Sequence, residues 1–174
     1  NLSLILYKLN NLFKAEEYIL KALSLNPDNQ DLKVTHAQIL IGLGRLDEAE
    51  KLSREMIQIN PDLAKSYSNL GFILMKQSKL NEAELATKKA LKIEPNSPEF
   101  LTNLGKILEA NGKTSEAISN FKKALIIQNN YYRAKDSLGY ILLKNGKHIE
   151  GLQKLREANG SIVFDMKTSS LSIE

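Results

Sequence analysis

The chain has 174 residues, of which 43% are hydrophobic and 25% are charged, the balance of an ordinary globular sequence. It contains no cysteine, which excludes disulfide bonds and thiolate metal sites. No apolar stretch approaches the roughly 20 residues of a membrane-spanning helix, and no signal-peptide pattern is visible. We therefore expect a cytoplasmic protein with no membrane partner. Because Asn1 falls inside an expected helix, we also expect the sequence to be a piece of a longer protein.

Several kinds of residue recur along the chain at one interval of 34 residues. A small residue recurs as Ala15, Ala49, Ala83, Ala117 and Gly151. A second small residue recurs as Ser3, Ala37, Gly71, Gly105 and Gly139, and a leucine as Leu6, Leu40, Leu74, Leu108 and Leu142. Proline holds the same interval at Pro27, Pro61 and Pro95, with Asn129 in the fourth place. Independent registers with one period indicate a tandem array of repeats.

These registers resemble the tetratricopeptide repeat signature, with an apolar and a small residue in one helix, a small residue in the next, and a closing proline. The resemblance covers residues 1–160 and implies an all-α fold, a right-handed superhelical solenoid of about five helix-turn-helix hairpins. The expected repeats are 1–29 (truncated), 30–63, 64–97, 98–131 and 132–160, and residues 161–174 form a tail outside them. The resemblance also implies that the first helix of each hairpin lines the inner, concave face.

The first two repeats carry the departures from the family pattern. In repeat 1 a helix begins near Leu12, and Pro27 ends it because proline cannot continue a helix. Repeat 2 is expected to hold helices over 30–42 and 47–59 around a turn at Gly44, with Asp47 as N-cap and Glu50 completing a capping box. His36 replaces the usual leucine, and we interpret it as a hydrogen-bonded core residue. Met56 replaces the usual alanine.

Repeats 3 and 4 match the signature best, through Leu70-Gly71 and Leu104-Gly105. We interpret these glycines as packing positions that let the second helix of the hairpin approach closely. They are not a phosphate-binding loop, because they lie inside expected helices and no strand precedes them.

Repeat 5 ends at Asn159-Gly160, a helix-stop pattern, and Gly151 inside its second helix predicts that this helix is the weakest of the array. In the tail, Ile162, Val163 and Phe164 form an extended-looking apolar patch. Three interpretations stay open: the tail covers the end of the last hairpin, begins a further domain, or lies in a groove as an extended ligand.

The residues expected on the inner face give the candidate binding site. Phe72 and Tyr140 are the expected aromatic anchors. Asn69 and Asn103 occupy equivalent places, and each offers a donor and an acceptor to a peptide backbone. In this they resemble two rungs of the asparagine ladder of the O-GlcNAc transferase. The expected peptide-binding residues are Gln38, Lys65, Asn69, Phe72, Lys76, Thr102, Asn103, Lys106, Arg133 and Tyr140.

A non-catalytic scaffold that binds a protein or peptide in the concave groove is the function that we expect. The alternative is the partner-presenting region of a larger enzyme, for example a glycosyltransferase. No catalytic constellation, cofactor site or metal site is evident, since His36 and His148 stand in different repeats. The net charge of +4 is scattered over expected outer helix faces, so we expect no nucleic-acid partner. Self-association through an open end of the solenoid is also expected.

Overall fold

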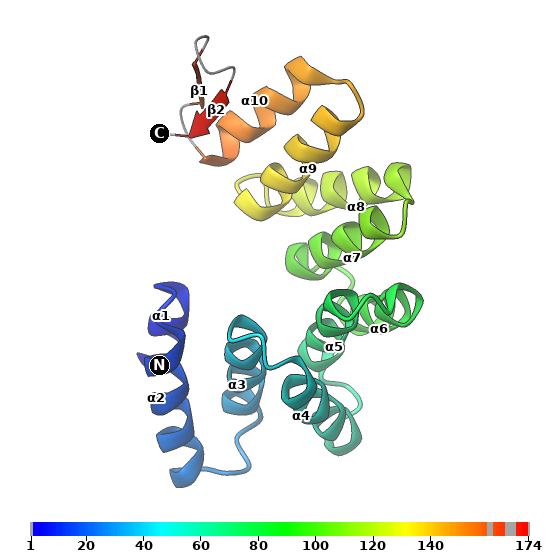
Figure 1. The fold of residues 1–174 in the computed structure, drawn as a ribbon. Coiled ribbons are helices and arrows are strands. Elements are labelled where there is room, and N and C mark those ends of the chain that lie inside the picture. The colour runs from blue at the N-terminus through cyan, green and yellow to red at the C-terminus, as the bar shows by residue number, and fades with distance from the viewer. Residues whose placement is uncertain (1, 160–161, 166–169, 174) are drawn as a thin grey trace. The chain divides into compact units, whose positions relative to one another are not determined.

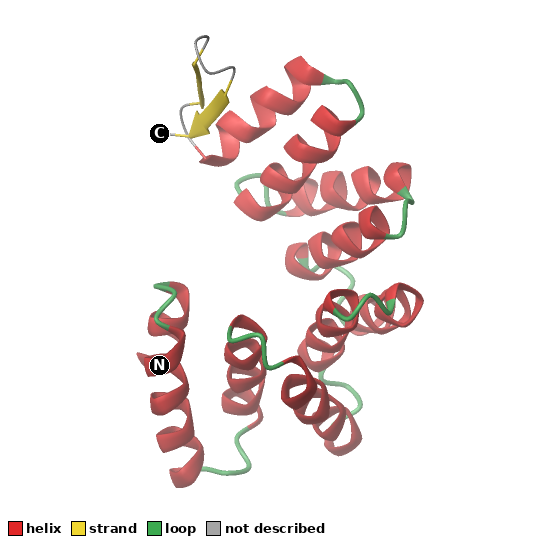
Figure 2. Ribbon diagram, viewed as in Figure 1, coloured by secondary structure: helices red, strands yellow, loops and turns green. Residues whose placement is uncertain are grey.

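The computed structural model describes residues 2–159, 162–165 and 170–173. Over these ranges the chain forms ten helices followed by two short strands (Figures 1 and 2). The helices are α1 (Leu2–Lys8), α2 (Leu12–Leu25), α3 (Gln30–Gly42), α4 (Leu46–Ile59), α5 (Ala64–Lys76), α6 (Leu80–Ile93), α7 (Pro98–Ala110), α8 (Thr114–Ile127), α9 (Tyr132–Lys144) and α10 (His148–Asn159). Successive helices pair as hairpins, and we call the first helix of each pair an A helix and the second a B helix. The expected array of helical hairpins is confirmed.

The helices pair because small residues let them approach closely. A Cβ added to Gly71 of α5 would lie 2.1 Å from Oγ1 of Thr87 in α6. A Cβ added to Gly105 of α7 would lie 2.4 Å from a ring carbon of Phe121 in α8. Both approaches are much shorter than van der Waals contact, so neither glycine leaves room for a side chain. The packing role predicted for these glycines agrees with this geometry.

The turn inside each hairpin contains one residue with a positive φ, always at the same position of the 34-residue repeat. Gly44, Gly112 and Gly146 have φ values of 75°, 74° and 75°, and Asn10 and Ser78 take the same register with φ values of 58° and 63°. Glycine adopts positive φ without steric cost, and asparagine tolerates it better than most residues. The turn predicted at Gly44 therefore repeats through the array even where glycine is absent.

The prediction for the start of the second helix of repeat 2 was wrong. Helix α4 begins at Leu46, its N-cap is Arg45, and no side chain caps it. Asp47 therefore lies in the first turn of the helix, and the Glu50 carboxylate bonds the Arg54 guanidinium at 2.8 Å instead of the cap. An acidic residue in the first turn still favours the helix through the helix dipole, which explains why the pattern looked like a cap.

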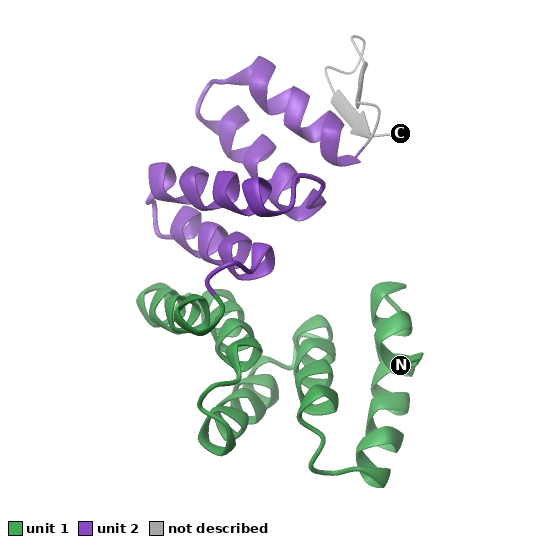
Figure 3. Ribbon diagram, turned by 180° about the vertical axis from the view of Figure 1, so that it is seen from behind, with its two compact units in different colours: residues 1–94 green, residues 95–174 purple. Residues whose placement is uncertain are grey.

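The array divides into two compact units, residues 1–94 (unit 1, α1–α6) and residues 95–174 (unit 2, α7–α10 with the strands) (Figure 3). In unit 1 one buried cluster joins Ala15 and Ile19 of α2 to Ile39 of α3. A second joins Leu40 of α3 and Ala49 of α4 to Ile73 of α5. In unit 1, the B helices α2 and α4 thus each pack a small residue, Ala15 or Ala49, against the A helix that follows.

The large Met56 side chain fits where alanine was expected, because the residue that it faces, Ser66, is small. The Met56 side chain is buried, and its Sδ accepts a hydrogen bond of 3.9 Å from the Ser66 hydroxyl of α5. In the preceding repeat the equivalent positions hold Ala22 and Leu32, a small residue with a large one. The first pair has its small residue on the B helix and its large residue on the following A helix, and the second pair has them the other way round. The two pairs therefore fill similar space.

The tail adds a feature that the all-α expectation lacked. Strands β1 (Ile162–Asp165) and β2 (Ser170–Ile173) pair antiparallel, with Ile162 opposite Ile173 and Asp165 opposite Ser170. The patch predicted to be extended is therefore strand β1, and β1 lies against α10. The interpretations of the tail as the start of a further domain or as a groove ligand concern residues that lie partly outside the described ranges.

Candidate functional site

In unit 1 the residues predicted to line the inner face lie on α3 and α5. On α5 the core takes Leu70, Ile73 and Leu74, which are buried. Phe72 and Met75 lie on the other side and are half-buried, and Lys76 beside them is exposed. The Lys76 ammonium lies 5.5 Å from the centre of the Phe72 ring, within the range of a cation–π interaction. On α3 the equivalent positions are Gln38 and Ile41, both half-buried, and Ile41 also packs against the buried cluster of unit 1. Lys65 at the start of α5 is exposed.

Sequence reasoning missed two residues that extend this face onto α1. Leu4 and Tyr7 are half-buried and stand 34 residues before Gln38 and Ile41. The Tyr7 ring lies beside the inner side of α3, because a Cβ built on Gly42 would come within 3.5 Å of its Cε2. The 34-residue period could have found both residues, since Leu4 corresponds to Phe72 and Tyr7 to Met75 two repeats later. The predicted face of unit 1 is therefore mainly apolar and aromatic over three A helices, and two of its members, Tyr7 and Ile41, also pack against the core.

One residue of the predicted site, Thr102, is closed to solvent, and so are other A-helix residues at its register and at the next one. Thr102 is 2% exposed, and its hydroxyl donates to the Pro98 carbonyl at 2.7 Å. Thr35 is 8% exposed and donates in the same way to the Asp31 carbonyl. Ser68, Ser137 and Val34 are buried as well. These residues present no open surface, so placing Thr102 in the binding site was wrong.

The two predicted asparagine rungs differ from each other. Asn69 is 8% exposed, and its Nδ2 has no hydrogen-bond partner within the described part of the chain. Asn103 is half-buried and already engaged in an interaction of its own. A buried amide without a partner is unusual, because an unmet donor costs free energy. The structure thus gives the two positions different environments, although the repeat makes them equivalent.

Charged groups dominate the inner face of unit 2. The Lys144 ammonium of α9 donates to the Glu109 carboxylate of α7 at 2.8 Å, and this hydrogen bond and the attraction between the charges raise the pKa of Lys144. The Asn159 side chain of α10 donates to Asp136 at 2.8 Å. Arg133 and Tyr140 are exposed, as predicted for the face, and Glu99 and Lys106 are half-buried. Burial, assisted by the negative charge of Glu99, raises the pKa of Tyr131 beside them.

A cluster of charged residues joins the first two hairpins of unit 1. The Arg45 guanidinium contacts the Glu16 and Glu48 carboxylates, each at 2.5 Å. His36 is half-buried, with Nε2 3.8 Å from the Glu16 carboxylate and no hydrogen bond to it. The hydrogen-bonded core histidine predicted here was therefore wrong in its bonding. Burial lowers the pKa of His36, which outweighs the opposing effect of Glu16.

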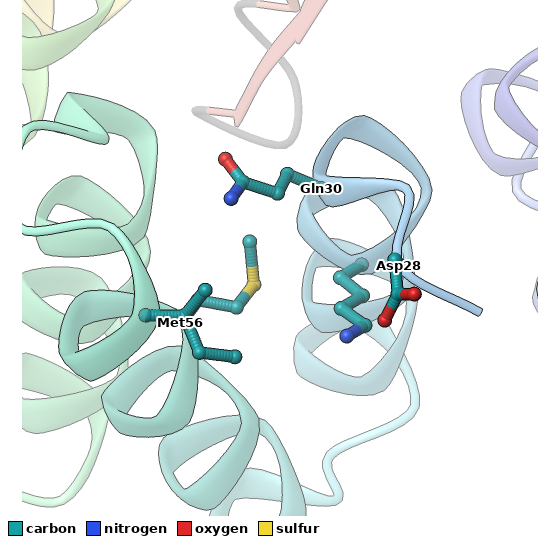
Figure 4. A pocket seen from close by; sticks show the side chains of 5 residues that line it. Asp28, Gln30 and Met56 are labelled. Atoms are coloured by element: carbon teal, nitrogen blue, oxygen red, sulfur yellow. The ribbon is translucent and has the colours of Figure 1, made fainter.

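A small hollow of about 220 Å³ lies between α3 and α4 and the loop before α3 (Figure 4). Its wall consists of Asp28, Gln30, Lys33, Met56 and Ile59. The Asn60 amide donates to Gln30 at 2.9 Å and holds this side chain at the rim. The hollow is smaller than the roughly 300 Å³ at which ligand pockets begin, so it is too small for a typical small-molecule ligand. No helix in the described ranges has the length and apolarity to cross a bilayer.

Three models of tetratricopeptide repeats match the chain, at residues 6–71, 64–97 and 86–119. Curated proteins gave no match. A solved tetratricopeptide repeat protein of the thermophile Thermus thermophilus is 21% identical, with a TM-score of 0.84 over 90% of this chain and 86% of that one. The structure of MamA is 18% identical with a TM-score of 0.65, over 91% of this chain and 92% of its own. A chain of the APC/C hetero-tetramer Cut9–Hcn1 is 16% identical with a TM-score of 0.80, over 90% of this chain and 32% of its own. At these identities the similarity concerns the fold.

Proposed function

Because the chain belongs to the tetratricopeptide repeat family, we propose that it is a non-catalytic scaffold that binds a protein or peptide partner along the inner faces of its A helices. One observation carries the proposal. The hairpin core is complete without Phe72 and Met75, yet these large side chains stay partly exposed beside Lys76. Partly exposed aromatic residues next to a cation supply contact area at little entropic cost, as binding anchors do.

The partner that fits this face is an extended or helical segment with apolar side chains spaced along it. Unit 1 offers the half-buried Leu4, Phe72 and Met75 as an apolar surface, next to Tyr7 and Ile41, which also pack against the core. Unit 2 offers exposed Arg133 and Tyr140 for polar contacts. The similarity to a chain of the Cut9–Hcn1 hetero-tetramer supports the assignment, since that array stands in a protein assembly.

A displayed peptide library tests the proposal, with the whole chain immobilised as bait. We expect Phe72→Ala to lose most of the peptides that the wild type retains, and Arg133→Ala or Tyr140→Ala to lose a smaller share. Leu85→Ala is the matched control, because Leu85 is 69% exposed on the B helix α6 and should retain all of them. Circular dichroism checks that the helical content is unchanged.

Two outcomes would remove the inner face from consideration: full retention of the peptides by Phe72→Ala and Tyr140→Ala together, or equal loss in the Leu85→Ala control. Nucleic acid serves as a separate probe. A filter-binding titration at several salt concentrations should show only weak retention that disappears as salt rises, as expected of nonspecific contacts.

A further inference from the structure

The hollow of the second hairpin lies beside a position that is large and apolar in the next two repeats. Lys33 on its wall stands at the register of Tyr67 in repeat 3 and Leu101 in repeat 4. Leu101 is 7% exposed, and Tyr67 is half-buried. Packed protein interiors contain few voids larger than a water molecule, and large side chains at one register serve that packing. Repeat 2 carries a lysine there instead, next to a hollow of about 220 Å³.

Repeat 5 shows how a lysine at this register is held against its own hairpin. The Lys135 ammonium of α9 lies 3.7 Å from the Glu157 carboxylate of α10, and the lysine side chain is 15% exposed. The corresponding residues of repeat 2 are Lys33 and Glu55, and they form no ion pair in the part of the chain that the structure describes. Lys33 is therefore not drawn across the hollow to α4.

The apolar part of the wall is more open than the same register elsewhere. Ile59 is 65% exposed, whereas Ile127 is 44% exposed and Ile93 is half-buried. Figure 4 shows Met56 of α4 on one side of the hollow, facing α3. Helix α2 contacts α3, and helix α5 contacts α4, so this hairpin has a neighbour on each side. The opening is thus a property of the hairpin and not of an end of the array.

The rim of the hollow carries one group of each charge. Asp28 is exposed and Lys33 is half-buried, and neither has an ion-pair partner within the described ranges. A peptide segment suits both groups, because a backbone N–H can donate to the carboxylate while a backbone C=O accepts from the ammonium. A ligand with a net charge would leave one of the two groups unmatched.

We propose that the hollow binds one large apolar side chain, a leucine or a phenylalanine, of a peptide segment from a partner protein, with the segment's backbone meeting Asp28 and Lys33. Met56 and Ile59 supply the apolar contact, and moving such a side chain out of water is the driving force. None of the residues that line the hollow belongs to the predicted inner-face site. The inference therefore goes beyond the proposed function and adds a second point of contact.

A displayed peptide library on the whole chain tests the proposal. We expect a set of peptides that share one leucine or phenylalanine, that wild type and Phe72→Ala retain, and that Lys33→Tyr loses. This substitution brings to the hollow the side chain that repeat 3 has at Tyr67. Lys51→Tyr is the matched control, because Lys51 is exposed on the same hairpin and the variant should keep the whole set.

Circular dichroism checks that the variants keep their helical content. A library that yields no peptides dependent on Lys33 overturns the proposal, and so does an equal loss in Lys51→Tyr. Peptides that Phe72→Ala loses report on the inner face, so failure of this inference and failure of the proposed function are told apart.

Methionine methyl NMR shows where the selected peptides bind, because Met56 lines the hollow and Met75 lies on the predicted inner face. The variants Met56→Leu and Met75→Leu assign the two ¹³C-methyl signals. A selected peptide should shift the Met56 signal and leave the Met75 signal in place, and replacing its leucine or phenylalanine with alanine should abolish the shift. A shift of Met75 alone overturns the proposal. So does a Met56 signal that moves with protein concentration in the absence of peptide, since a second copy would then occupy the hollow.

Discussion

Units 1 and 2 build the same hairpin and expose different chemistry on their inner faces. In unit 1 the face is apolar and aromatic, with Phe72 under the Lys76 ammonium. In unit 2 it is charged, with Lys144 paired to Glu109 across two A helices. The comparison teaches that the repeat constrains the side of each A helix that faces its own B helix. The other side is free to vary, and that is where function can differ between repeats.

The units differ inside their hairpins as well. Gly71 of unit 1 faces the small Thr87 hydroxyl, which donates to the Ala83 carbonyl at 3.0 Å, whereas Gly105 of unit 2 faces the large, rigid Phe121 ring. Both B-helix residues are fully buried. The B-helix side chain opposite the glycine is therefore small in unit 1 and large in unit 2. Replacing each glycine with alanine should destabilise the two units to different extents.

The largest effect should come from Gly105→Ala in unit 2. The new methyl would meet three atoms of the Phe121 ring within 2.9 Å, and the buried ring has no room to move. We expect the free energy of unfolding to fall by about 3 kcal/mol through overpacking. Gly71→Ala should cost less, about 1–2 kcal/mol, because a single hydroxyl rather than a ring must shift, at the cost of its hydrogen bond to the Ala83 carbonyl, and because alanine favours the helix. Urea denaturation measures both, and equal losses would contradict the comparison.

Met56→Ala should be the next largest, and it concerns unit 1 alone. Removing a buried methionine leaves a cavity, and we expect the free energy of unfolding to fall by about 2–3 kcal/mol. Adding Ser66→Leu should recover part of this loss, because alanine with leucine is the pair that the preceding repeat uses. If the double variant is no more stable than Met56→Ala, the exchange of large and small residues is not what fills this contact.

Acidification should destabilise unit 1 through His36. Burial holds the pKa of His36 below the 6.5 of an unfolded chain, so the unfolded state binds the proton first. The free energy of unfolding is therefore highest above pH 6.5 and falls as the pH decreases toward the folded-state pKa. His36→Gln should flatten this dependence in urea titrations at several pH values. His148→Gln, at an exposed position of unit 2, should leave it unchanged.

The smallest effect should follow from Lys144→Ala on the inner face of unit 2. The Lys144 ammonium is 70% exposed, so solvent screens its pair with Glu109. We expect the free energy of unfolding to change by no more than about 0.5 kcal/mol. Thermal unfolding at low and high salt measures it, and a loss well above this value would show that the pair holds α7 and α9 together.

Most of the fold could be predicted from the sequence, because the 34-residue period repeats in independent registers. Helices α3, α5, α7 and α9 begin at the residues that the period places at the start of a repeat. The candidate site was harder to predict. Thr102 and Ser137 were expected on the same side of their helices as Lys106 and Tyr140, yet the first two are buried and Tyr140 is exposed. A helical register gives the direction of a side chain but not the distance to the next helix.

The sequence by itself determined the hairpins, their turns and the small residues where two helices meet. These features depend on neighbours within about one repeat, which is the range that a period records. Only the tertiary structure decided which polar residues are buried and why Met56 stands opposite Ser66. The physical reason is that burial depends on whether a second helix is present, and identical residues at one register cannot report that.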